Sequence, residues 1–120
     1  MIVVQSSRAV TPKPTEGIAH PARGELELAA VLHALSDPVR LKMVAALAAG
    51  DGEHTCKSFD VPVTKSTCTH HFKILREAGI IRQRQAGTSR LNALRRDDLD
   101  ARFPRLLATI LQAASADATA

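Results

Sequence analysis

Aromatic side chains are nearly absent from this chain, whose 120 residues include three Phe and no Tyr or Trp. Modules that hold single-stranded nucleic acid stack the bases on several aromatic rings, so the composition argues against that class of function. Long apolar runs are also missing, and the N-terminus does not resemble a signal peptide. We therefore expect a cytoplasmic protein that neither spans nor binds a membrane.

Cysteine is scarce as well, since the chain has only Cys56 and Cys68. Two cysteines do not make a disulfide framework, and a reducing cytosol keeps thiols free, so we expect two free thiols. The sequence also lacks a phosphate-binding glycine loop, a paired-carboxylate signature and a nucleophile with an activating base. We therefore expect no enzymatic activity and no cofactor.

Acidic residues are almost missing from residues 64–96, which hold eight Lys or Arg and a single acid, Glu77. The net charge of this stretch is +7, whereas the whole chain carries +4, so the remaining residues sum to −3. Basic charge concentrated on an otherwise mildly acidic chain is typical of a protein that binds a polyanion. A solvated basic face is the alternative, and the concentration of charge disfavours it.

Residues 63–79, VTKSTCTHHFKILREAG, predict a helix with two distinct faces. Thr64 can cap its first turn, and Gly79 can end it in the left-handed conformation. An apolar stripe with helical period consists of Cys68, His71, Phe72 and Leu75. The other faces carry Ser66, Thr67, Thr69, His70 and Lys73. Short polar side chains near a helix N-terminus suit a DNA major groove, although an ordinary solvated face is the alternative.

The rest of the chain predicts one folded domain, residues 23–115, between a disordered arm (1–22) and a disordered tail (116–120). Helices are expected over residues 24–35 and 38–49, and Asp37 and Pro38 are suited to start the second of them. Residues 53–60 can include one helical turn that bears Cys56 and Phe59. A last helical region is expected from Asp97 to about residue 114, with a turn or kink at Pro104.

The period changes after Gly79, where residues 80–85 and 90–95 predict two strands around a glycine-containing turn. This hairpin carries four arginines, and Arg96 follows it directly. A short helix, a turn, a longer helix and a basic hairpin, in that order, predict a winged helix-turn-helix fold that is mainly α with a small β-hairpin. The arginines of such a wing can meet phosphates or enter the minor groove.

The first and last helices are more apolar than a monomer of this size can easily cover. We therefore predict a homodimer in which they pair across a two-fold axis, so that two recognition helices face successive major grooves. The predicted interface residues are Leu28, Val31, Leu32, Leu106, Leu107, Ile110 and Leu111.

Three segments resemble the arsenic-repressor (ArsR) family of bacterial winged-helix regulators: ALSDPVRLKMVAAL, STCTHHFKILREAGII and RQRQAGTSRLNAL. With the flanking helices, the resemblance covers about residues 24–114. It implies a homodimeric, sequence-specific DNA-binding transcriptional regulator, usually a repressor that a signal releases from a palindromic operator. It also implies that Ser66, Thr67, Thr69 and His70 contact bases or phosphates. With the basic side chains of the helix and the wing, the predicted DNA contacts are Lys65, Ser66, Thr67, Thr69, His70, Lys73, Arg82, Arg84 and Arg90.

Many members of this family sense metals, but this chain lacks the ligands of both familiar sites. The short helix before the turn would need two close cysteines and has only Cys56, preceded by His54, while the last helix has no histidine. We therefore predict no metal site and no release from the operator by zinc, nickel, cobalt or cadmium. No role is assigned to His20 or His33.

Two alternatives stay open at this point. Within the same class of protein, Cys56 and Cys68 are a candidate thiol switch or, with His54 and His71, ligands of a thiophilic ion. The opposing interpretation makes Cys68 and His71 core side chains. From another class, the chain could be a winged-helix module that contacts protein instead of DNA, which the basic stretch and the polar helix face disfavour.

Overall fold

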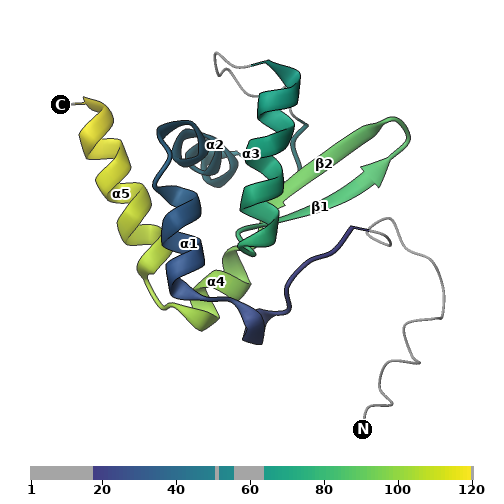
Figure 1. Ribbon diagram of the computed structural model, residues 1–120. Helices are drawn as coiled ribbons and strands as arrows, with labels where there is room; N and C mark the ends of the chain where they lie inside the picture. The colour runs from purple at the N-terminus through teal and green to yellow at the C-terminus, as the bar shows by residue number, and fades with distance from the viewer. Residues whose placement is uncertain (1–17, 51, 56–63, 120) are drawn as a thin grey trace, which may run out of the picture.

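The chain folds into a helical body from which one β-hairpin projects, as the computed structural model in Figure 1 shows. It describes residues 18–50, 52–55 and 64–119. The elements are a 3-10 helix η2 (Arg23–Glu25), helices α1 (Leu28–Leu35), α2 (Pro38–Ala49) and α3 (Lys65–Glu77), strands β1 (Ile81–Ala86) and β2 (Ser89–Leu94), and helices α4 (Arg96–Arg102) and α5 (Leu106–Thr119). The predicted fold class, mainly α with a small antiparallel hairpin, is confirmed.

Two side-chain caps fix where the central helices begin. Asp37 accepts hydrogen bonds from the backbone amides of Val39 and Arg40 at 2.8 and 3.1 Å, and Pro38 occupies the first turn of α2. The Thr64 hydroxyl accepts from the Thr67 amide at 3.2 Å at the start of α3. Both predicted caps are therefore confirmed.

The end of α3 depends on Gly79, which has a φ of +86°. A Cβ atom at this position would also lie 2.0 Å from Cδ2 of Leu26 and 3.2 Å from Cγ of Pro21. Glycine is therefore required twice, once for the left-handed backbone and once because the chain before α1 passes directly over it.

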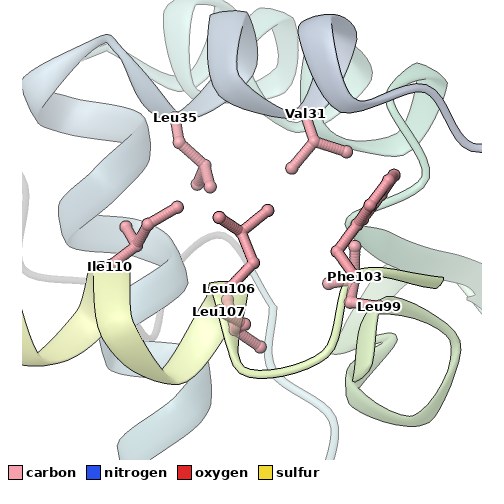
Figure 2. A pocket seen from close by; sticks show the side chains of 7 residues that line it. All are labelled: Val31, Leu35, Leu99, Phe103, Leu106, Leu107 and Ile110. Atoms are coloured by element: carbon pink, nitrogen blue, oxygen red, sulfur yellow. The ribbon is translucent and has the colours of Figure 1, made fainter. Parts of the chain in front are cut away.

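One apolar core holds α1, α2 and α3 together and extends under α4 and α5. Its members are the buried residues Leu26, Val31, Ala34, Leu35, Met43, Val44, Leu47, Cys68, Phe72, Leu75, Ala78, Ile80, Ile81, Leu99 and Leu107. Figure 2 shows how α1 meets the C-terminal helices: Val31 and Leu35 face a set of side chains that includes Leu106, Leu107 and Ile110 of α5. Apolar side chains of α1 thus contribute to the packing of α5, which also lies against α2 and α4.

The turn predicted at Pro104 is confirmed, since the last helical region is divided there into α4 and α5, with Arg105 at a φ of +69°. Two predicted boundaries differ from the structure. The helix expected over residues 24–35 is interrupted, because Leu26 takes an extended conformation (φ −68°, ψ 132°) that buries its side chain in the core. Helix α5 continues to Thr119, beyond the expected end near residue 114. The predicted helical turn with Cys56 and Phe59 lies outside the described residues.

No helix in the described part of the chain combines the length and the apolar character needed to cross a bilayer.

Candidate nucleic-acid interface

Helix α3 has the two faces that the sequence predicts. Cys68, Phe72 and Leu75 are at most 2% exposed, and His71 is 9% exposed. The predicted contact residues of the opposite faces are all exposed: Lys65, Ser66, Thr67, Thr69, His70 and Lys73. An amphipathic helix anchored along one stripe therefore presents a polar and cationic surface, mainly from its N-terminal half, to solvent.

The hydroxyl groups on this exposed face are not equivalent. Thr69 donates its hydroxyl hydrogen to the backbone oxygen of Lys65 at 3.0 Å, so that hydrogen is used within the helix. Thr67 instead accepts from the Thr64 hydroxyl at 3.0 Å, which leaves its own hydrogen able to donate elsewhere. Thr67 and His70 lie about one helical turn apart on α3, and both are exposed.

A buried arginine fixes α3 against the preceding helices. Arg40, 7% exposed, donates through Nε to the backbone oxygen of Ala34 at 2.7 Å, and its NH1 lies 3.2 Å from Nδ1 of His71. A guanidinium only donates, so Nδ1 of His71 is the acceptor and carries no proton. His71 is buried, as the core interpretation predicts. From the sequence, no role was assigned to Arg40. The Asp-Pro-x-Arg segment that contains it is the feature of the sequence that could have identified it.

The three predicted wing arginines differ in how freely their charge is presented. Arg84 donates to both carboxylate oxygens of Glu53, at 2.6 and 2.8 Å. This side-chain hydrogen bond, helped by the charge of Arg84 and opposed by burial, lowers the pKa of Glu53. Arg82 lies 3.6 Å from Asp98 with about half of its side chain exposed. Arg90 is exposed, and its Nε has one long contact of 3.4 Å to Oε1 of Gln85. Arg90 is therefore the wing cation most available to a phosphate.

A buried polar chain at the root of the hairpin ties the wing to α3. Gln83 and Asn92 are paired across the strands and are 3% and 2% exposed. Arg76 of α3 donates to Oε1 of Gln83 at 2.8 Å, and Nε2 of Gln83 donates to Oδ1 of Asn92 at 2.7 Å. Asn92 also donates from Nδ2 to the backbone oxygen of His54 at 3.1 Å. No role was assigned to Gln83 and Asn92 from the sequence, because polar residues of a half-exposed strand are expected on its exposed face.

The expectation of free thiols is wrong for Cys68, which is buried in the core and disulfide-bonded. The number of cysteines in a sequence does not show whether two sulfur atoms lie close enough to bond, because that distance depends on the tertiary structure. The other cysteine of the chain, Cys56, lies outside the described residues. Among the residues that the structure does describe, no three or more Cys, His, Asp or Glu side chains gather in a way that could hold a metal ion.

The residues predicted for a dimer interface fall into two groups. Leu28 and Leu32 of α1 are 46% and 43% exposed, and their spacing of four residues places them on one face of the helix. Val31 and Leu107 are buried in the core of the chain itself, at 2% and 3% exposure. Leu106, Ile110 and Leu111 are partly buried against that core. The apolar surface available to a partner is therefore carried chiefly by α1.

Comparison with known proteins supports the class of protein that this geometry indicates. A family model described as a helix-turn-helix domain matches residues 35–84, from the end of α1 into β1. An uncharacterised helix-turn-helix-type transcriptional regulator of Bacillus subtilis, YceK, is 32% identical over 84 residues, which are 68% of this chain and 84% of YceK. A second such regulator, MJ1325 of Methanocaldococcus jannaschii, is 36% identical over 61 residues, covering 50% of this chain and 68% of its own length.

A solved structure gives the same result for the fold. The transcriptional repressor BigR from Xylella fastidiosa superposes with a TM-score of 0.53 at 26% identity, covering 77% of this chain and 83% of BigR. The mainly helical architecture with its hairpin is thus a winged helix-turn-helix fold. The chain belongs to the family of helix-turn-helix-type transcriptional regulators, which are DNA-binding proteins.

Proposed function

We propose that this chain is a homodimeric repressor of the ArsR kind that binds a palindromic operator and is released by a signal. The observation that carries the proposal is that the exposed polar face of α3 and the basic hairpin are joined by hydrogen bonds through Gln83. The exposed face of α3 offers Thr67 and His70 for base readout, and the hairpin tied to the same helix offers Arg90. The repressor mode follows the likeness to BigR, a transcriptional repressor.

In this proposal the remaining exposed side chains position the protein on the duplex. Lys65, Ser66 and Lys73 are placed to reach phosphates from α3, while Arg82 does so from the wing. Arg84 contributes less, because Glu53 already neutralises its charge. Exposed Leu28 and Leu32 pair with their copies across a two-fold axis, which sets the two recognition helices one helical turn apart on DNA.

The proposal is tested by the salt dependence of duplex binding. We expect the wild-type protein to bind random duplex DNA with affinity that falls steeply as salt rises, since phosphate contacts release counterions. Arg90→Ala should reduce the slope of log K against log salt by about one for each phosphate that Arg90 neutralises in the wild type. Arg84→Ala should reduce it less, because Arg84 is paired with Glu53.

Arg102→Ala, which removes an exposed arginine on α4, is the matched control and should leave the slope unchanged. An Arg90→Ala slope equal to that of the wild type would show that the hairpin does not approach DNA. No measurable duplex binding by the wild type would refute the DNA-binding function and favour a winged-helix module that contacts protein.

The disulfide at Cys68 favours a second, narrower candidate, a repressor whose signal is thiol oxidation. Cys68 is 2% exposed on the buried stripe of α3, so a covalent bond at its sulfur constrains the recognition helix from within. Cys56 is the only other cysteine of the chain and is therefore its intramolecular candidate partner. We propose that oxidation of this pair weakens operator binding and that reduction restores it.

This candidate predicts that a thiol reductant raises operator affinity about tenfold, a typical coupling between two sites. Cys56→Ser should bind with the same affinity with and without reductant. Unchanged wild-type affinity on reduction would contradict the thiol signal, and a reductant effect that persists in Cys56→Ser would contradict the role of Cys56. Parallel titrations with zinc and arsenite complete the test, because stoichiometric release by either would indicate a metal or metalloid signal instead.

A further inference from the structure

The chain before α1 crosses the junction between α3 and the hairpin, and we call residues 18–26 the strap. Figure 1 shows this purple segment passing along the base of the hairpin on its way to α1. Leu26 is buried in the core. A side chain at Gly79, which ends α3, would clash with Leu26. The backbone oxygen of Pro21 accepts from NH1 of Arg95 at 2.8 Å, just after β2. The strap therefore contacts both elements of the proposed DNA-binding unit.

His20 of the strap contacts the wing itself. Its Nε2 accepts a hydrogen bond from the backbone amide of Gln83, in the middle of β1, at 2.9 Å. In the described part of the chain β1 pairs only with β2, so its other edge has no strand partner. The imidazole thus satisfies an edge amide that would otherwise need water.

Gln83 is also the centre of the polar chain that joins the wing to α3. Its side chain links Arg76 of α3 to Asn92 of β2, while its backbone amide is held by His20. Gln83 is therefore held from two sides, through its side chain by α3 and β2 and through its backbone amide by the strap. Breaking the His20 hydrogen bond detaches the strap from β1, while the contacts of Pro21 with Arg95, of Arg23 with Asp98 and of Leu26 with the core remain.

The bond requires a neutral ring, because Nε2 can accept only when it carries no proton. The charges that act on the ring come from Arg76 of α3, Arg82 of β1 and Arg95 after β2. Asp98 of α4 forms ion pairs with Arg82 and Arg95. Burial, together with the charges of Arg82, Arg95 and Arg76, lowers the pKa of His20, and a backbone hydrogen bond at Ile18 opposes the shift.

Docking of the strap depends on pH because His20 binds protons differently in the docked and undocked states. The docked strap binds fewer protons at His20 than the undocked strap, so docking gains stability as pH rises. That stabilisation is fully present above the ordinary histidine pKa and is lost as pH falls through the lowered one.

We propose that His20 is a positioning residue for DNA binding, which holds the wing at its angle to α3 while neutral and undocks the strap when protonated. The inference rests on the proposed DNA-binding function. It adds a residue outside the recognition helix and the wing, and it predicts that the geometry of the DNA-binding surface depends on pH.

Hydrogen exchange at the Gln83 amide, followed by NMR on the full chain without DNA, tests the docking itself. At about pH 7.5 we expect this amide to be protected from exchange in the wild type. At about pH 5.5 it should lose protection by more than the pH dependence of the exchange chemistry accounts for, since the two values lie on either side of the ordinary histidine pKa. His20→Gln, whose side-chain oxygen can replace Nε2, should stay protected at both values. His20→Ala should be unprotected at both, and His33→Gln, at an exposed histidine of α1, should behave as wild type.

Binding to a random duplex of about 30 base pairs, enough for two half-sites, tests the consequence for DNA. At the higher pH, His20→Gln should bind the duplex as tightly as the wild type does. At the lower pH it should bind about threefold to tenfold more tightly than the wild type, because a pKa difference of one unit corresponds to about a tenfold change in affinity. Comparing the variants with the wild type at each pH cancels the pH effects that both proteins share. Gln83 protection that is unchanged in His20→Ala, or an affinity ratio that does not vary with pH, would overturn the inference. A wild type that binds no duplex refutes the proposed function, and with it this role, while the exchange data still report whether His20 docks the strap.

Discussion

Leu32→Glu is expected to separate the proposed dimer into folded monomers and to remove high-affinity operator binding. Leu32 is 43% exposed, so the substitution leaves the core of the chain intact. In the dimer it removes one buried leucine from each protomer, worth about 1.5–3 kcal/mol apiece, and brings two carboxylates near a two-fold axis. Because about 1.4 kcal/mol is tenfold, dimerisation should weaken at least about 100-fold.

Light scattering across a dilution series measures the dimer, and circular dichroism checks that the monomer is folded. Ala46→Glu, which adds the same charge on an exposed position of α2, should remain dimeric. Leu107→Glu is unsuitable for this purpose, because Leu107 is 3% exposed and the charge would disrupt the core. A wild type that is monomeric at micromolar concentration, or a Leu32→Glu protein that stays dimeric, would contradict the α1 interface.

Thr67→Ala and His70→Ala are expected to weaken operator binding far more than binding to random duplex DNA. Each should cost about 1–3 kcal/mol on the operator, or about fivefold to 150-fold, because a base contact carries sequence information that a phosphate contact does not. Thr67→Ala keeps the capping hydrogen bond from the backbone amide of residue 67 to Thr64 and removes only the bond between the two hydroxyl groups. Selection from a randomised duplex pool supplies the operator, and competition binding measures both affinities.

Thr109→Ala, at an exposed threonine of α5, is the matched control and should behave as wild type on both DNAs. Equal losses on operator and random duplex would show that Thr67 and His70 touch only phosphates. Unchanged binding to both DNAs would show that this face of α3 is not the reading face.

Much of the fold could be predicted from sequence because its signals are local. The caps Asp37 and Thr64, the glycine that ends α3 and the change of period after it each act within a few residues. The buried stripe of α3 also follows from spacing alone, which separated Cys68 and His71 from the exposed Thr67 and His70. The concentration of basic residues then indicated a polyanion as the partner.

The contacts that support the candidate site could not be predicted in the same way, because they join residues far apart in the chain. Arg40 meets His71, Arg84 meets Glu53, and His20 meets Gln83 across separations of 31, 31 and 63 residues. Spacing along one helix or strand carries no information about such pairs. A polar residue in a strand, such as Gln83, therefore reads as exposed until the fold covers it.

The apolar helices α1 and α5 show which features the sequence determines and which depend on the tertiary structure. The sequence determined that α1 and α5 each carry an apolar face, because the period of apolar residues follows the helix. Only the tertiary structure decided that Val31 and Leu107 belong to the core of the chain while Leu28 and Leu32 remain exposed. The physical reason is that periodicity identifies which side chains share a face, whereas the neighbour that covers each of them is set by packing between distant elements.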